Sequence, residues 1–296
     1  ITNPLNPISS LKSGVFLGVV DGAPFRTETN LLPDTRTVQV GDAAVQLVKY
    51  QYMAFSDGRI EEIAIDYFAQ DDDGNVWYFG EDVADYDEDG RVFTNEGTWF
   101  FGKDNAPIAM IMAAKPKVGN VWLAEEVAPA AWEEVTVKAV DATAAGPTGP
   151  LTGGLIGSEL HMDGTRQEKI FMPGYGEFST GSLATDDLEA LALTVPIDAL
   201  QAPLPDALKT MGSASAAIFN AATANDFAAA ATSLASLSSA WTTYQSGQVP
   251  PLLKAEMARV LPLLETAVDD QSAADTRDEV IALARVIYDL RLRYQP

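Results

Sequence analysis

Cysteine is absent from this chain, and histidine occurs once, at His161. The lack of cysteine excludes disulfides, thiolate catalysis and thiolate metal sites. A Ser-His-Asp triad would depend on that one histidine, and no Gly-x-Ser-x-Gly elbow precedes a helix-like segment. We therefore assign no catalytic residue and no bound organic cofactor, and we favour a protein that is not an enzyme.

Basic residues are scarce, with 19 Lys and Arg against 42 Asp and Glu and a net charge of -23. This excess of negative charge argues against nucleic acid and against anionic membrane surfaces as partners, because both would be repelled. No apolar run reaches the roughly 18 residues that span a bilayer, so we predict no transmembrane segment. Cationic partners, divalent metal ions among them, are favoured.

The chain begins with Ile1-Thr2-Asn3-Pro4 rather than with methionine. This favours a protein exported after cleavage of a signal sequence. We expect an extracytoplasmic location, which includes secreted, periplasmic and cell-surface proteins. An exported chain without disulfides would draw its stability from its core, from cations or from assembly.

The most specific motif is an acidic loop between Asp85 and Glu96. Its spacing is Asp-x-Asp-x-Asp-Gly, five residues and then Glu, which is the spacing of a twelve-residue calcium loop. Ca²⁺ is then the predicted cofactor. Its ligands would be the side chains of Asp85, Asp87, Asp89 and Glu96 and the carbonyl group of Arg91.

The flanks of this loop indicate strands rather than the helices of an EF-hand. Residues 76–79 and 91–94 are aromatic and β-branched runs, and Asp89-Gly90 between them is a hairpin turn signal. Two interpretations stay open: a solvated acidic turn and a β-hairpin that binds a cation.

Residues 1–185 read as an antiparallel β domain. Asp-Gly pairs at 21–22, 57–58, 73–74, 89–90 and 163–164 predict tight turns, which favours a meander folded as a barrel or a sandwich. The Gly- and Pro-rich stretch 142–157 is expected to be a mobile loop. The predicted strands are 15–20, 35–40, 45–55, 60–69, 76–79, 91–94, 98–101, 122–127, 132–140, 158–162 and 168–171.

Residues 186–296 differ in composition, because they are rich in Ala, Leu, Ser and Thr, and their apolar residues recur with helical spacing. We predict helices at 205–222, 225–244, 251–268 and 272–294, with a cap at Ser272 and a kink or break at Pro262. Short connections predict an antiparallel four-helix bundle, so the fold class is α+β. The Ala-rich face around 228–231 is a candidate surface for a protein partner.

Four acidic doublets stand on predicted strands or their edges: Glu61-Glu62, Glu81-Asp82, Glu125-Glu126 and Glu133-Glu134. Adjacent residues of a strand point to opposite faces, so no doublet can form a facing carboxylate pair by itself. Two carboxylates from different strands would still support a carboxylate-based polysaccharide hydrolase.

Several aromatic residues and His161 have two open interpretations. Trp77, Phe79, Trp99 and Phe101 alternate along predicted strands, and they either fill the core or line a ligand cavity. Trp122 and Trp132 stand beside acidic doublets and could form a rim for a cationic or sugar-like ligand. His161 is interpreted as structural, with a copper site at His161 and Met162 as the alternative.

The runs Asp66–Asp71, Gly74–Asp82 and Glu96–Trp99 give the chain a resemblance to a known family. Together with Lys115–Gly119 and Met172–Gly176, they resemble a family of uncharacterised exported bacterial proteins over roughly residues 5–180. The most specific part is Trp-Tyr-Phe-Gly-Glu-Asp, residues 77–82. The resemblance implies export and a β-rich fold and supplies no activity. Its members often have a shorter turn at positions 85–90, which would make a cation site here a local elaboration.

The sequence thus predicts an exported, non-enzymatic binding or assembly protein with an acidic hairpin, which is either a calcium site or a solvated turn. Three alternatives stay open. One is a barrel that carries a small apolar or aromatic ligand. The others are the carboxylate-based polysaccharide hydrolase and a structural subunit of an extracellular assembly that docks through the helical bundle.

Overall fold

The computed structural model describes residues 1–182 and 185–294. The chain forms two compact units, Ile1–Ile197 and Asp198–Pro296. The first unit contains all the β-strands of the described residues and the second contains the four α-helices. An α+β fold with a β-rich N-terminal part and four C-terminal helices is therefore confirmed.

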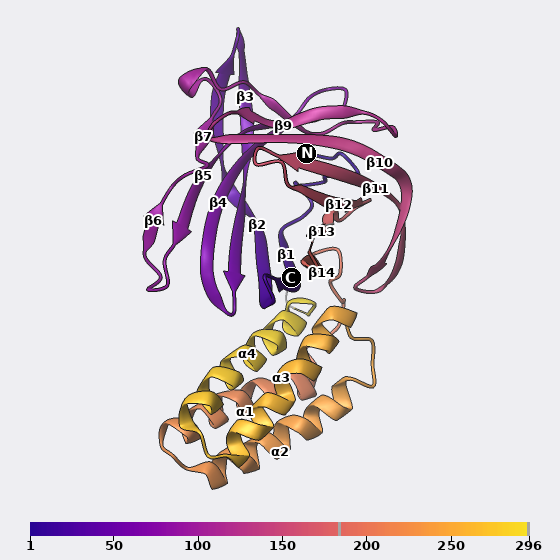
Figure 1. Cartoon of the computed structure of the whole chain (residues 1–296). Coiled ribbons are helices and arrows are strands. Elements are labelled where there is room, and N and C mark those ends of the chain that lie inside the picture. Colours follow the sequence, from indigo (N-terminus) through magenta and orange to yellow (C-terminus); the bar gives the residue numbers. More distant parts are fainter. Residues whose placement is uncertain (183–184, 295–296) are drawn as a thin grey trace. The chain divides into compact units, whose positions relative to one another are not determined.

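The N-terminal unit contains one antiparallel sheet of 14 strands, in the order β6-β5-β4-β3-β2-β1-β14-β13-β12-β11-β10-β9, with β7 and β8 paired to β5 (Figure 1). In the described residues the hydrogen-bonded path ends at β6 and β9, so the sheet is not closed. The strands are β1 Ser13–Val20, β2 Ala23–Val40, β3 Ala43–Ser56, β4 Arg59–Gln70, β5 Val76–Tyr86, β6 Val92–Thr94, β7 Trp99–Phe100, β8 Ala109–Met112, β9 Val121–Val127, β10 Ala131–Gly146, β11 Gly149–His161, β12 Arg166–Met172, β13 Gly176–Ser182 and β14 Leu188–Val195.

All five Asp-Gly pairs lie between consecutive paired strands, as the sequence predicts. At Asp21-Gly22 and Asp57-Gly58 both residues have positive φ, between 45° and 77°. Two residues with positive φ define the tight hairpin turn whose twist matches that of the flanking strands. These local turns explain why most neighbours in the sheet are also neighbours in sequence.

Two sequence expectations need correction. The stretch 142–157 is not a loop, because it forms the far ends of β10 and β11, paired from Ala142–Gly154 out to Gly146–Gly149. The helical unit begins at Asp198 rather than at 186, because β14 pairs with β1 along Leu188–Val195. Both segments are poor in β-branched residues, and cross-strand pairing decides their structure.

The N-terminal segment before β1 packs against the sheet. Asn3 is buried and its side-chain amide donates hydrogen bonds to the carbonyl groups of Gly74 and Ala113. Ile8 joins a hydrophobic core with Phe68, Tyr78 and nine further buried residues, most of them on strands. The two halves of the sheet curve toward each other around this segment (Figure 1). The segment therefore covers one part of the space that the sheet encloses.

The C-terminal unit consists of α1 Asp206–Thr223, α2 Phe227–Tyr244, α3 Pro251–Asp269 and α4 Ala273–Leu292. The Ser272 side chain accepts a hydrogen bond from the Asp275 backbone N–H, which confirms the predicted cap of α4. Helix α3 continues through Pro262 without a break. Buried Arg293 donates to the carbonyl groups of Asp198 and Gln248 and so ties α4 to both segments. Within the described residues, none of the helices has the length and apolar character needed to cross a membrane.

Candidate functional site: a cavity lined by carboxyl groups

The N-terminal unit encloses two adjoining cavities that share part of their lining. The smaller, here the aromatic cavity, has a volume of ≈ 230 Å³ and the larger, here the acidic cavity, ≈ 580 Å³. Strands from both halves of the sheet contribute to the two linings. They include β2–β4 in one half and β9–β13 in the other. The residues common to both are Tyr52, Asp66, Glu125, Glu133, Lys169, Glu177 and Glu189.

One member of each acidic doublet faces this space. Glu62, Glu81, Glu125 and Glu133 line the acidic cavity, whereas their neighbours Glu61, Asp82, Glu126 and Glu134 line neither cavity. The alternation of side chains along a strand, which the sequence predicts, therefore holds at all four doublets. The sheet then brings the four inward members, which belong to β4, β5, β9 and β10, around one space.

Five further carboxyl groups line the cavities. Asp66 lies on the same face of β4 as Glu62, and Glu159, Glu177 and Glu189 come from β11, β13 and β14. Asp187, just before β14, lines the acidic cavity. One lysine, Lys169 of β12, faces them, and its ammonium lies 3.0 Å from a Glu159 oxygen and 3.8 Å from a Glu177 oxygen. The side chains that line the cavities thus carry many more potential negative charges than positive ones.

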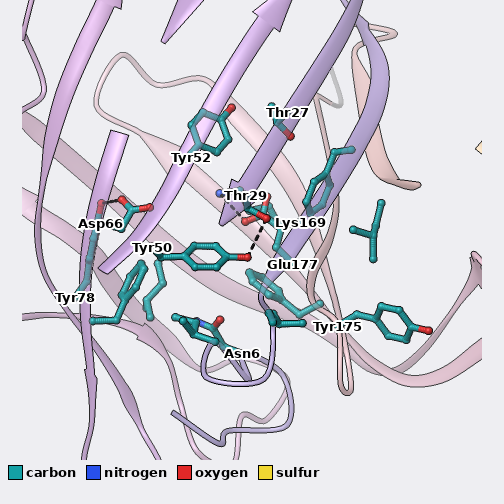
Figure 2. Close-up of a pocket in the computed structure, with 18 of the residues that line it drawn as sticks. Asn6, Thr27, Thr29, Tyr50, Tyr52, Asp66, Tyr78, Lys169, Tyr175 and Glu177 are labelled. Carbon is teal, nitrogen blue, oxygen red and sulfur yellow. Dashed lines mark hydrogen bonds and ion pairs between the residues drawn. The ribbon is translucent and has the colours of Figure 1, made fainter. Parts of the chain in front are cut away.

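The aromatic cavity adds a second character to the site. Its lining includes Phe16, Tyr50, Tyr52, Phe68, Tyr78, Phe171 and Tyr175, together with Ile8 and Leu11 of the N-terminal segment. Figure 2 shows Tyr50 and Tyr78 beside polar partners. The Tyr50 hydroxyl lies 2.9 Å from Thr29 Oγ1, and the Tyr78 hydroxyl donates to Asp66 Oδ1 at 2.6 Å. Apolar rings and carboxyl groups therefore share one wall.

Burial perturbs the carboxyl groups strongly. Desolvation and, after it, the charge of Glu177 raise the pKa of Glu189 to about 7, against the hydroxyl of Thr27 and the charge of Lys169, which lower it. Desolvation also raises the pKa of Asp66, against the hydrogen bond from Tyr78, which lowers it. The pKa of buried Glu159 rises to about 7 despite Lys169. In the empty protein, part of this lining is consequently protonated near neutral pH.

Glu81 and Glu125 form a hydrogen-bonded pair. Burial and the neighbouring carboxylates raise the pKa of Glu81, so that Glu81 keeps its proton and donates it toward Glu125. The Trp99 indole N–H also donates to Glu125, at 3.3 Å. Trp99 is buried and packs against the Tyr78 ring, which supports the interpretation that Trp99 fills the core.

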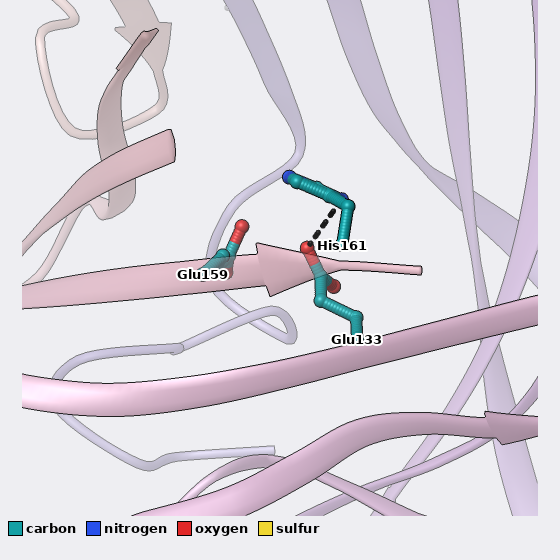
Figure 3. A group of neighbouring side chains, drawn as sticks. All are labelled: Glu133, Glu159 and His161. Atoms are coloured by element: carbon teal, nitrogen blue, oxygen red, sulfur yellow. Dashed lines mark ion pairs between the residues drawn. The ribbon is translucent and has the colours of Figure 1, made fainter. Parts of the chain in front are cut away.

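His161 lies at the edge of the acidic cavity beside Glu133 and Glu159 (Figure 3). One ligand atom from each of the three residues lies within 4.8 Å of those of the other two, and this is the single such group of His, Asp and Glu in the part of the chain that the structure describes. His161 Nδ1 is 3.6 Å from Glu133 Oε1. Met162, the alternative partner in a copper site, is 53% exposed.

The structure places the predicted calcium ligands around the turn between β5 and β6. Asp87 Oδ1 accepts hydrogen bonds from the backbone N–H groups of Asp89 and Arg91, and the Arg91 guanidinium pairs with Asp89. Asp85 lies at the end of β5, opposite Thr94, and burial and then nearby Glu96 raise the pKa of Asp85. The flanking strands are confirmed. Calcium binding by these five residues stays a prediction.

Comparison with protein-family models, with curated proteins and with solved structures finds no match. The resemblance carried by residues 66–82 therefore rests on the sequence motifs alone.

The sequence contains part of the signal for this site. The doublets and their alternation are visible, and so is the i, i+2 spacing of Glu159 and His161 that places both on one face of β11. The sequence does not show which strands lie next to one another in the sheet. The convergence of β4 and β5 with β9–β12 depends on pairings between residues far apart in the chain, above all β1 with β14.

Proposed function

We propose that the N-terminal unit binds a small organic cation, with an aromatic or aliphatic body, in the adjoining cavities. The observation that carries this proposal is the lining of two adjoining cavities by nine carboxyl groups and one lysine. The proposal keeps the binding role and the cationic character of the ligand predicted from the sequence, and it moves the site from the hairpin to the cavities, where the predicted alternative placed an apolar or aromatic ligand.

So many carboxyl groups around one space repel one another and are poorly solvated. Buried carboxylates without counter-ions are costly, and these groups respond by keeping protons, as the raised pKa of Glu189 shows. A bound ammonium group would supply the missing positive charge in a medium of low dielectric constant, where the attraction is stronger than in water. The site is thus complementary to a cation and repels an anion.

The aromatic cavity indicates the rest of the ligand. Phe16, Phe68 and Phe171 offer apolar area, and the rings of Tyr50 and Tyr52 can contact an ammonium group through their faces. Both parts adjoin Asp66 and Glu189, so a ligand can place its body against the rings and its charge against the carboxylates (Figure 2). Such a site suits an amphipathic amine better than a metal ion alone.

Three probes that differ only in their polar group test this proposal: phenethylamine, 2-phenylethanol and phenylacetate. Binding to the full chain, freed of metal with a chelator, is measured by titration calorimetry and by the fluorescence of Trp99, which touches Glu125. We expect the amine to bind at least about tenfold more tightly than the alcohol, and the acid not to bind.

The doublet on β9 supplies a matched pair of variants. Glu125→Gln removes a charge that faces the cavity, and Glu126→Gln removes the same charge from the adjacent position outside it. Only the first should weaken binding of the amine. Equal affinity for the amine and the alcohol would instead support the carrier of a neutral aromatic ligand, and tight binding of the acid would contradict both.

A second candidate function is acid–base catalysis, which the raised pKa of Glu81 favours. Glycoside hydrolysis pairs a carboxyl group that keeps its proton with a second carboxyl group about 5–9.5 Å away, and Glu81 shares the acidic cavity with several further carboxyl groups. A panel of nitrophenyl glycosides tests it. Release of nitrophenol with a bell-shaped pH profile, lost in Glu81→Gln, would support a polysaccharide hydrolase, and no release from any member would remove this candidate.

A further inference from the structure

We propose that Glu133, Glu159 and His161 form a binding site for a divalent transition-metal ion, of which Zn²⁺ is the probe, at the edge of the acidic cavity. This site is distinct from the predicted calcium hairpin and does not depend on the binding of an organic cation. Figure 3 shows the three side chains on the neighbouring strands β10 and β11.

Backbone pairing places the three residues together. Glu133 is the direct cross-strand partner of His161, and Glu159 precedes His161 by two residues, so it projects from the same face of β11. Ligand atoms of all three lie within 4.8 Å of one another. Ligands bound to one Zn²⁺ at about 2.0–2.2 Å lie roughly 3.4 Å apart in tetrahedral geometry, so the side chains would have to rotate toward one another to hold the ion.

One observation, apart from the proximity of the three residues, points to a ligand here. The Nε2 atom of His161 is buried and has no hydrogen-bond partner among the described residues. The neighbouring Glu159 side chain is only 2% exposed, and the Lys169 ammonium, 3.0 Å from its Oε2, is its counter-ion. Buried polar atoms in folded proteins are normally satisfied, so an unpartnered imidazole nitrogen beside a buried carboxylate calls for an explanation.

The donor set selects the class of metal. One imidazole nitrogen and two carboxylates suit Zn²⁺ and related first-row ions, whereas Ca²⁺ prefers a shell of oxygen atoms alone. Three protein ligands leave at least one coordination position for water or for a bound molecule in the cavity. Lys169 is the competing cation: metal binding would require its ammonium to move away from Glu159, toward Glu177, which already lies at 3.8 Å.

Titration calorimetry of the chelator-treated full chain with Zn²⁺ is the direct test. We expect one Zn²⁺ per chain, an affinity lowered at least about tenfold in His161→Gln and in Glu133→Gln, and no change in Glu134→Gln, which alters the outward neighbour. Co²⁺ gives a second readout, because its visible absorption changes intensity when nitrogen and oxygen ligands of a protein replace water. Loss of that absorption in His161→Gln would support imidazole ligation.

Two results would overturn the site: no Zn²⁺ bound at micromolar concentration, or Zn²⁺ bound equally well by His161→Gln. A Ca²⁺ titration separates this site from the hairpin, because Ca²⁺ binding that survives in His161→Gln and disappears in Asp87→Asn would belong to the hairpin. The amine experiment is performed without metal, so failure of either proposal leaves the other standing.

Discussion

At the scale of single residues, the cavity-facing members of the acidic doublets form the proposed binding site and also lower the stability of the folded protein. Glu62 is part-buried, and burial together with Asp85 and Glu61 raises its pKa. Above that pKa, the folded protein holds a poorly solvated charge that the unfolded chain holds in water. Residues that suit a cationic ligand are thus the ones that destabilise the empty protein.

Glu62→Gln should therefore stabilise the protein without ligand at pH 8, because it removes a poorly solvated charge. The gain should fade toward about pH 4.5, where wild-type Glu62 is protonated and resembles glutamine. Denaturant melts monitored by tryptophan fluorescence measure both values. The matched control is Glu61→Gln, an exposed position on the other face of β4, for which we expect a smaller change at either pH.

Equal shifts in the two variants would mean that the general surface charge, rather than burial in the cavity, sets the effect.

At the scale of elements, Gly80 in the Trp-Tyr-Phe-Gly-Glu-Asp motif holds β7 against β5. Its φ is +121°, and it is paired with Phe100. A Cβ atom built on Gly80 would lie 2.3 Å from the Trp99 carbonyl oxygen, closer than any real contact. The glycine thus allows the close approach that places the Trp99 indole beside Glu125.

Gly80→Ala should cost roughly 3 kcal/mol or more of unfolding free energy, because the backbone conformation is strained and β7 must move. Gly90→Ala is the control, because its φ of +73° is also unfavourable for alanine but no atom lies within 4 Å of the added Cβ. We expect about 1 kcal/mol there. Chemical denaturation gives the free energies, and near-ultraviolet circular dichroism reports whether Trp99 has lost its fixed environment.

A loss in Gly80→Ala no larger than that in Gly90→Ala would contradict the close-packing argument.

Elements with strong local signals could be predicted from the sequence, and those defined by distant partners could not. The four helices and the Ser272 cap depend on spacing within one segment, and all are found where the pattern indicates. Strand β14, Leu-Glu-Ala-Leu-Ala-Leu-Thr-Val, reads as helix-forming by composition. It is a strand because β1 on one side and β13 on the other pair with it.

At the scale of the whole molecule, the raised carboxyl pKa values concentrate in the N-terminal unit. For Glu189 the pKa rises from 4.5 to about 7, so the folded state holds an extra proton between these values. The groups that face Glu189 are Glu177, Lys169 and Thr27. Because the folded state binds more protons than the unfolded chain in this window, the stability of the unit falls as pH rises through it.

We therefore expect the N-terminal unit to melt at a lower temperature at pH 8 than at pH 5, while the helical unit changes less. Asp34 and Asp163, whose pKa values are lowered by hydrogen bonds, act in the opposite direction but only at lower pH. Tryptophan fluorescence follows mainly the first unit, which holds Trp77, Trp99, Trp122 and Trp132. Far-ultraviolet circular dichroism is dominated by the helices.

Parallel shifts in both signals would show that the pH effect is not specific to the cavity. Saturating phenethylamine should reduce the shift in fluorescence, because a bound cation favours the ionised carboxylates.

The acidic doublets also bear on how faithfully the sheet must assemble. A strand that pairs one residue out of register exchanges its two faces. At Glu61-Glu62, Glu81-Asp82, Glu125-Glu126 and Glu133-Glu134, such a slip would still turn a carboxyl group inward. The cavity lining would therefore stay acidic even if one of these strands paired one residue out of register. The register of the strands must instead be set by features that depend on one exact position. Examples are Gly80 of β5, which pairs with Phe100 of β7, and the positive-φ turns Asp21-Gly22 and Asp57-Gly58.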